Sequence, residues 1–247
     1  MGTIIAVTAA AGMGGTGLGG LAAYLFRRGT DRTVSVLLSF AAGMMLAVVC
    51  ADLLTDAIQA GPGLSALPAA SASVLAGCGG IWLLEELVSG LQAGAKRGGL
   101  FLAGVVMAAA IALHNLPEGM VIGASYAADL AEAGQDGRMM ALVIGLHNIP
   151  EGMAVAVPLA AGGASRGRAV LTTAVAGAPT VLGAVLGFCL GTMGPGLQML
   201  TLGGASGAML YVVFGELLPE SFRLCRSPAP VMAAVLGVLT GMGVVLG

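Results

Sequence analysis

Charge is scarce in this sequence. Charged residues make up 9% of the 247 positions, against about 25% in a typical soluble domain. Hydrophobic residues make up 57%, and the mean hydropathy is +0.98. The composition excludes a soluble globular protein and indicates one that crosses a lipid bilayer several times. With one tryptophan and no basic tract, the chain offers nothing that favours a nucleic-acid partner.

Cysteine is also rare and has no motif. The four cysteines (Cys50, Cys78, Cys189 and Cys225) are scattered without a CxxC pair, so we read them as small apolar packing residues. The first 26 residues are apolar but have no positively charged start. That pattern argues against a cleaved signal peptide and for a first spanning helix.

Long apolar runs are plentiful. A spanning helix needs about 20 apolar residues, and eight segments satisfy this: 3–26, 34–59, 66–90, 99–126, 137–161, 168–192, 196–221 and 229–247. No loop between them is large enough to fold alone. The sequence therefore predicts an all-α, polytopic membrane protein of eight transmembrane helices, with residues 1–247 forming a single transmembrane domain.

The basic residues predict the orientation of these helices. Nine of them follow odd-numbered segments: Arg27, Arg28, Arg32, Lys96, Arg97, Arg166, Arg168, Arg223 and Arg226. Only Arg138 follows an even-numbered one. Since cytoplasmic loops carry an excess of Lys and Arg, the odd loops are expected in the cytoplasm and both termini outside.

Two segments resemble each other. GMMLAVVCADLLTDA (43–57) aligns without a gap on GAMLYVVFGELLPES (207–221), at an offset of 164. Acidic residues coincide as well, because Asp52 and Asp56 fall on Glu216 and Glu220. The two segments are expected to run in opposite directions, so the match predicts an inverted repeat of the kind found in many transporters. The alternative is chance similarity between apolar helices.

Eight acidic residues lie inside the predicted spans or near their ends: Asp52, Asp56, Glu85, Glu86, Glu118, Glu151, Glu216 and Glu220. A carboxylate near mid-membrane costs about 2.5–3.5 kcal/mol, and all the basic residues lie in loops or at helix ends. Each acid must therefore be protonated, hydrated or bound to a cation from outside.

The predicted orientation gives these acids a depth, outer for Asp52 and Asp56, middle for Glu118 and Glu151, and inner for Glu216 and Glu220. Such a series indicates a cation pathway. For Asp56, Glu85, Glu86 and Glu220, a solvated helix end is an equally good interpretation.

The two histidines of the chain both open the same hexapeptide, HNLPEG at 114–119 and HNIPEG at 147–152. Residues four apart share a helix face. His114 therefore lies over Glu118, and His147 over Glu151, with Asn115 and Asn148 about 100° round on the flank.

The short connection near 127–136 makes these two helices an antiparallel hairpin. Residues equidistant from its turn then lie at one depth, which pairs His114 with Glu151 and Glu118 with His147. Two imidazoles and two carboxylates are thus predicted to meet at mid-membrane.

The prolines of the hexapeptides add backbone oxygens to this level. Pro117 and Pro150 have no N–H, so the carbonyls of Leu113 and Leu146 lose their helical partners. Imidazole with carboxylate suits zinc, iron, manganese and other divalent first-row metals. The alternative is that these residues only kink and pack the hairpin, which leaves the glutamates unexplained.

The chain resembles the ZIP (zinc/iron permease) family of divalent-metal transporters, especially its short bacterial members. The resemblance lies in the paired hexapeptides, in SFAAGMMLA of the second segment and in GAMLYVVFGELLPES of the seventh. The resemblance implies inverted repeats of helices 1–3 and 6–8 around a helix 4–5 hairpin. It also implies a metal site at that hairpin, often binuclear, a homodimer, and alternating access by elevator-like sliding of one helix bundle.

Carried over residue by residue, the resemblance assigns a first metal position to His114, Glu118, His147 and Glu151. A second position would use Asn115, Asn148 and the same two glutamates as bridges. Many members add a glutamate on the sixth helix, where this chain has AGAPTVLGA (176–184) and thus Thr180. The second position is therefore expected to be weak or absent.

We expect a secondary transporter, without an organic cofactor, that moves Zn²⁺ or another divalent metal (Cd²⁺, Fe²⁺, Mn²⁺, Co²⁺) into the cytoplasm across a bacterial inner membrane. An intramembrane metal-dependent hydrolase is the runner-up, but there is no HExxH and no Ser or Cys beside either hexapeptide. A scaffold protein without transport would leave the buried acids unexplained.

Overall fold

The computed structural model of the chain describes residues 1–25, 31–61, 63–95, 99–132 and 136–246. Throughout these ranges the regular structure is helical, and they contain no strand. Arg27, Arg28, Lys96 and Arg97, on which the predicted orientation partly rests, lie outside the described residues, as does the side chain of Glu85.

The helices follow one another with short connections. In chain order they are α1 (Gly2–Ala9), η1 (Ala10–Gly14), α2 (Gly15–Leu25), α3 (Asp31–Val48), η2 (Val49–Leu53), α4 (Leu54–Ala60), η3 (Gly63–Ala66), α5 (Leu67–Ala95), α6 (Gly99–Glu132), α7 (Asp136–Ala161), α8 (Arg166–Ala176), α9 (Pro179–Thr192), α10 (Pro195–Val212), η4 (Val213–Leu217), α11 (Leu218–Leu224) and α12 (Pro228–Leu246). Of the four η segments, η3 is a 3₁₀ turn, and η1, η2 and η4 are single π-helical turns inside longer helices.

Each predicted span coincides with one helix or with one run of joined helices. Among the described residues, five stretches are long and apolar enough to cross a bilayer: Gly2–Ala23, Asp31–Ala60, Gly137–Ala160, Arg166–Gly191 and Pro195–Leu224. Two shorter apolar helices cover Leu67–Leu83 and Pro228–Gly243. The all-helical membrane architecture is thus confirmed, and the count of eight crossings stays a prediction.

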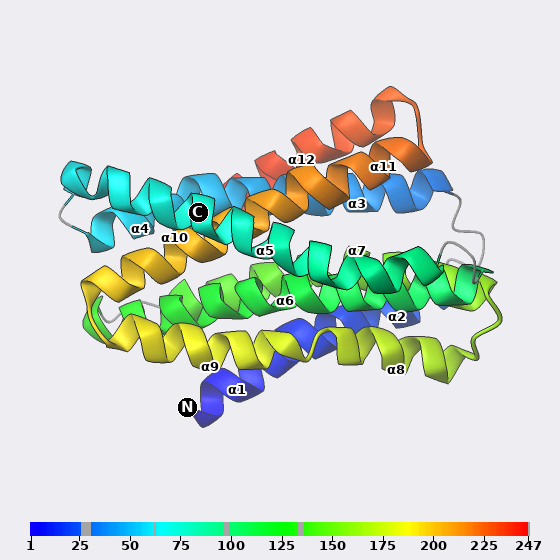
Figure 1. The fold of residues 1–247 in the computed structure, drawn as a ribbon, viewed down its shortest axis with the longest axis horizontal. Helices are drawn as coiled ribbons and strands as arrows, with labels where there is room; N and C mark the ends of the chain where they lie inside the picture. Colours follow the sequence, from blue (N-terminus) through cyan, green and yellow to red (C-terminus); the bar gives the residue numbers. More distant parts are fainter. Residues whose placement is uncertain (26–30, 62, 96–98, 133–135, 247) are drawn as a thin grey trace.

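The helices pack as two bundles, which Figure 1 shows one above the other. The hairpin bundle contains α1–α2, α6, α7 and α8–α9; its largest contacts join α6 to α9 and to α7, and α2 to α7. The flanking bundle contains α3–α4, α5, α10–α11 and α12, with α3 against α12 and α5 against α10. Helices α3 and α10 of the flanking bundle meet α6, α7 and α9 along a seam.

Inside each bundle, glycines bring backbones into direct contact. A Cβ added at Gly43 of α3 would overlap the carbonyl oxygen of Ala234 in α12, and one at Gly119 of α6 would overlap that of Thr180 in α9. Wherever a Cβ added to a described glycine would come within 3.0 Å of another segment, that segment belongs to the same bundle. Small residues are the usual means of close helix packing in membranes.

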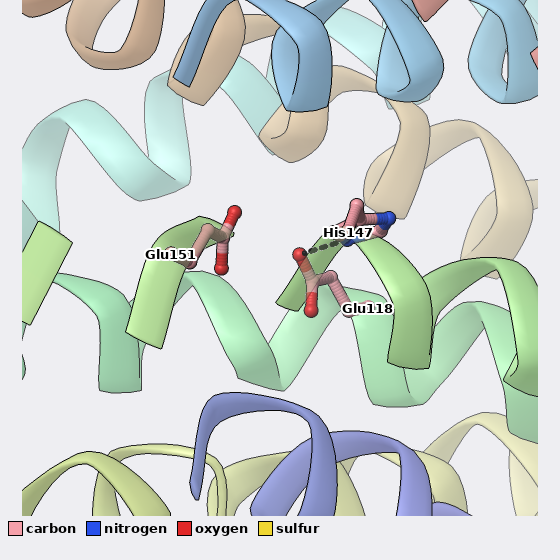
Figure 2. A group of neighbouring side chains, drawn as sticks. All are labelled: Glu118, His147 and Glu151. Carbon is pink, nitrogen blue, oxygen red and sulfur yellow. Dashed lines mark hydrogen bonds and ion pairs between the residues drawn. The ribbon is translucent and has the colours of Figure 1, made fainter. Parts of the chain in front are cut away.

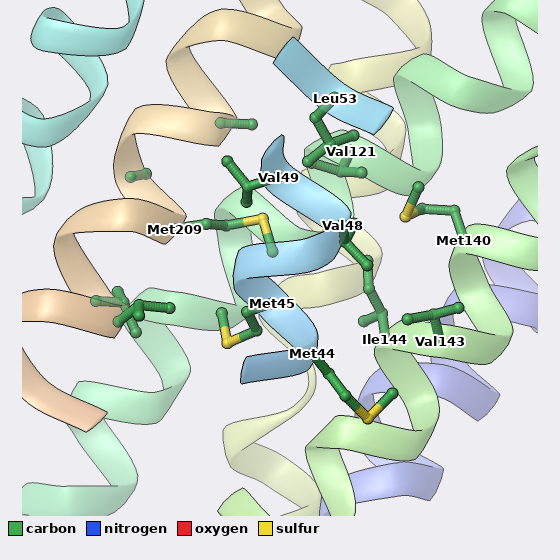
Figure 3. Packing of buried hydrophobic residues seen from close by; sticks show 14 of the residues in the cluster. Met44, Met45, Val48, Val49, Leu53, Val121, Met140, Val143, Ile144 and Met209 are labelled. Carbon is green, nitrogen blue, oxygen red and sulfur yellow. The ribbon is translucent and has the colours of Figure 1, made fainter. Parts of the chain in front are cut away.

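The seam between the bundles is built differently. Figure 3 shows a buried apolar cluster that combines residues of α3 and η2 with residues of α6 and α7: Met44, Met45, Val48, Val49, Leu53, Val121, Met140, Val143 and Ile144. Methionine thioethers and branched aliphatic groups fill the space here, and backbones do not interlock. The two bundles are thus each tightly joined internally and more loosely joined to each other.

Helix bounds recur at the offset predicted by the repeat. The three parts of the run α3–η2–α4 span 31–48, 49–53 and 54–60. The three parts of the run α10–η4–α11 span 195–212, 213–217 and 218–224, so that each bound is shifted by 164 positions. The two runs lie antiparallel and side by side in Figure 1. Each carries a π turn with an acidic residue in it, Asp52 in η2 and Glu216 in η4.

Candidate metal centre

The two hexapeptides lie in the middle of α6 and α7, and both helices continue through Pro117 and Pro150. These helices are antiparallel neighbours within the hairpin bundle. All six polar side chains of the hexapeptides are buried, and those of His147, Glu118 and Glu151 are among the largest fully buried side chains. Helical spacing accounts for this, because residues three and four apart face the same neighbours.

Three of these side chains converge. Nε2 of His147 lies 3.0 Å from Oε1 of Glu118, as the hairpin register predicts. Glu118, His147 and Glu151 each offer a ligand atom within 4.8 Å of the other two (Figure 2). Two ligands at about 2.0–2.2 Å from one zinc ion are at most about 4.4 Å apart, so small side-chain rotations would bring all three onto a shared ion.

Apart from the contact between Oε1 of Glu118 and His147, the carboxylate oxygens of this cluster have no hydrogen-bond partner among the described residues. Among the residues that the structure describes, neither oxygen of Glu151 has a hydrogen-bond partner, nor has Oε2 of Glu118 or Nδ1 of His147. Burying an unpaired carboxylate is costly, and a cation bound between the two removes most of that cost. One imidazole nitrogen with two carboxylates is a donor set suited to a divalent transition metal.

His114 takes a different partner from the one predicted. The register pairs it with Glu151, but its Nε2 lies 3.4 Å from Oε2 of Glu216 in η4, across the seam. His114 is therefore not one of the three converging residues. Because η4 is a π turn, the side chains of α10–α11 that face the hairpin differ from those that a regular helical period predicts.

The two asparagines lie on the flank of the cluster and bond to each other. Nδ2 of Asn148 donates to Oδ1 of Asn115 over 3.3 Å, and the hydroxyl of Thr180 donates to the same oxygen over 2.9 Å. Thr180, which stands where the resemblance expects a glutamate on the sixth helix, thus lies beside this flank. Whether either asparagine binds metal stays a prediction.

The remaining acidic residues of the predicted pathway have more varied surroundings. The expectation that no cation pairs with them is wrong for Glu220, because its carboxylate accepts a 2.7 Å hydrogen bond from Nε of Arg223 near the end of α11. Its surroundings match a solvated helix end, which was one of the two interpretations that the sequence allowed for Glu220. Asp52 in η2 and Asp56 in α4 are both half-buried.

Two backbone groups near the site were missed by the sequence reasoning. The carbonyls of Ala11, in the π turn η1, and Ala176, at the break between α8 and α9, accept hydrogen bonds from Asn148 and Asn115. The signal was present in the helix-breaking residues, GMGG at 12–15 and the Gly177–Ala178–Pro179 turn. Such breaks leave carbonyls available inside a span.

Known proteins resemble this chain along most of its length. A family model described as "ZIP Zinc transporter" matches residues 90–247. "Zinc transporter ZupT" of Chlorobium limicola is 33% identical over 260 residues, covering 97% of this chain and 94% of that protein. "Zinc transporter ZIPB" of Bordetella bronchiseptica is 35% identical over 252 residues, covering 96% of this chain and 77% of that protein.

"Zinc transporter GufA" of Myxococcus xanthus matches a shorter part, at 40% identity over 114 residues, 46% of this chain and 44% of that protein. The family match covers more than half of the chain, and two of these relatives match nearly all of it. The resemblance seen in the paired hexapeptides is therefore confirmed. This chain is an integral membrane protein that belongs to the ZIP family, a family of zinc transporters and not of enzymes.

Proposed function

We propose that the protein is a secondary transporter that carries Zn²⁺, or another divalent metal such as Cd²⁺, Fe²⁺, Mn²⁺ or Co²⁺, into the cytoplasm by alternating access. One observation supports this most: a buried imidazole and two carboxylates converge within the hairpin, and no Lys or Arg of the described residues pairs with them. As the family resemblance implies, it would act as a single transmembrane domain (1–247), as a homodimer, in a bacterial cytoplasmic membrane, with no organic cofactor.

The metal would be bound by Glu118, His147 and Glu151, which come from α6 and α7 of the same bundle. An ion held there would be moved together with the hairpin bundle. The pair formed by His114 and Glu216 spans the seam on the side of the cluster that the predicted orientation places toward the cytoplasm. We assign it the next step inward, and we assign Asp52 and Asp56 to the approach from outside.

Sliding of the two bundles provides a physical route for alternating access. Glycine contacts inside each bundle would keep it rigid, and the side-chain seam would let one bundle shift against the other. The recurrence of helix bounds at an offset of 164 supports an inverted repeat, whose two halves can exchange inward and outward arrangements.

Metal uptake into sealed proteoliposomes tests the proposal. The wild type should accumulate Zn²⁺, and Glu118→Ala should reduce uptake by about two orders of magnitude or more, because it removes a ligand of the ion. Glu86→Gln, an exposed acid on α5, serves as the matched control and should transport normally. Absence of uptake by a folded wild-type protein, which a hydrolase or a scaffold would show, would contradict the proposal.

A further inference from the structure

We infer that Asn115 and Thr180 are positioning residues and not metal ligands, and that Oδ1 of Asn148 completes a site for a single ion in this chain. The inference rests on the proposed function, because it assumes that the hairpin binds metal. It departs from the two-ion arrangement implied by the family resemblance, in which both asparagines are ligands. The hydrogen bonds of the two amide groups carry it.

All four amide N–H bonds of the asparagine pair are already used. Nδ2 of Asn115 donates to the carbonyls of Ile111 (2.9 Å) and Ala176 (3.2 Å), and Nδ2 of Asn148 donates to the carbonyl of Ala11 and to Oδ1 of Asn115 (both 3.3 Å). Backbone carbonyls can only accept. Turning either amide round would therefore set oxygen against oxygen, and the neighbours fix which amide atom lies where.

The oxygens of the two amides differ in whether their lone pairs are already used in hydrogen bonds. Oδ1 of Asn115 accepts from Asn148 and from the hydroxyl of Thr180, which occupies both of its lone pairs. Oδ1 of Asn148 is buried and has no hydrogen-bond partner among the described residues. Asn148 lies three residues before Glu151 on α7, a spacing that puts neighbouring side chains on one face. A cation in the cluster is the partner that this oxygen lacks.

Thr180 is held in place by close packing on two sides. A Cβ at Gly12 in η1 would overlap its hydroxyl, and a Cβ at Gly119 in α6 would overlap its carbonyl oxygen. The side chain is fully buried, and its hydroxyl makes the bond to Asn115. The network thus ties η1, α6, α7 and α9 together behind the metal cluster and orients Asn148.

A sulfur substitution at each asparagine distinguishes ligand from positioning residue. Zinc is added in less than equimolar amount to purified Asn148→Cys and Asn115→Cys proteins, and zinc K-edge X-ray absorption is recorded. Asn148→Cys should show a sulfur neighbour at about 2.3 Å. Asn115→Cys should show no sulfur neighbour, as in the wild type, which controls for the native cysteines. A sulfur neighbour in Asn115→Cys, or none in zinc-loaded Asn148→Cys, would overturn the assignment.

A second pair of variants keeps the test independent of those substitutions. Thr180→Val removes the hydroxyl at nearly constant volume and should weaken zinc binding by about two- to tenfold, the effect of one lost hydrogen bond. Thr180→Ser keeps the donor and should restore the wild-type affinity. Wild-type affinity in Thr180→Val would count against a positioning role for Thr180.

The number of ions at the hairpin separates this inference from the proposed function. Anomalous scattering from crystals grown with zinc should show one ion there in the wild type. Two fully occupied ions at the hairpin would refute the single-ion site and leave the transport proposal standing. A wild type that binds no zinc at all would contradict both.

Discussion

Contacts inside the two bundles and contacts between them are made of different residues. Inside, glycines such as Gly43 and Gly119 allow one backbone to touch another, so helices interlock over several turns. Between the bundles, methionine and aliphatic side chains such as Met44, Met140 and Ile144 meet (Figure 3). Close backbone packing gives one preferred register, whereas flexible thioethers fill several arrangements equally well. The composition of each interface therefore indicates which parts move together.

The metal cluster follows the same division. Glu118, His147 and Glu151 all belong to the hairpin bundle, so a shift along the seam leaves their mutual geometry unchanged. The contact between His114 and Glu216 crosses the seam, so the same shift would break it. Under the proposed mechanism, the comparison separates the residues that would hold the ion from the residues that it would meet on the way.

The largest expected effect comes from breaking a backbone contact inside a bundle. Gly237→Leu in α12 places a side chain on the carbonyl of Phe40 and should cost about 3 kcal/mol or more, because overpacking against backbone relaxes poorly. Gly243→Leu on the same helix is the control, since no atom of the described part of the chain lies within 4 Å of a Cβ there.

Thermal unfolding in detergent measures both Gly237→Leu and Gly243→Leu. We expect a large loss of stability for Gly237→Leu and little change in stability for Gly243→Leu. Equal stability of the two variants would mean that glycine contacts do not hold the flanking bundle together.

An intermediate effect is expected at the polar contact across the seam. Glu216→Gln removes the negative charge beside His114 and leaves the three converging side chains in place. Zinc uptake should fall about tenfold, as it does when an outer partner of a metal site is lost, while equilibrium zinc affinity stays near that of the wild type. Uptake and affinity lost together would place Glu216 among the tight ligands instead.

The smallest effect is expected in the seam itself. Met140→Leu conserves volume at a buried seam position and should change the free energy of unfolding by less than about 1.5 kcal/mol. Uptake should remain close to that of the wild type. A loss as large as that of Gly237→Leu would show that the seam is as rigid as the bundles, and the sliding mechanism would lose its support.

Much of this architecture could be predicted from the sequence because its patterns are local. Apolar length located the long helical stretches of the described residues, and the four-residue spacing within HNLPEG and HNIPEG placed histidine and glutamate on one face. The antiparallel register also predicted the contact between Glu118 and His147, found at 3.0 Å. These predictions need only helix geometry and a short connection.

The rest depends on irregular turns and on packing between distant segments. The contact of His114 with Glu216, which lies in the π turn η4, was not predicted. The carbonyls of Ala11 and Ala176 reach the asparagines because two broken helices cross behind the hairpin. Apolar sequences contain no period that reveals such crossings, although glycine at 12 and 177 marks where they occur.

The central claim, that the hairpin bundle slides as a body past the flanking bundle, is tested most directly by electron-spin distance measurements. In a background without the native cysteines, spin labels at Leu130 and Met193 report within the hairpin bundle, and labels at Leu130 and Gln59 report across the seam; all three side chains are exposed. Adding and removing zinc in lipid should shift the distance between Leu130 and Gln59 and leave the distance between Leu130 and Met193 unchanged. A shift in both distances, or in neither, would contradict the account.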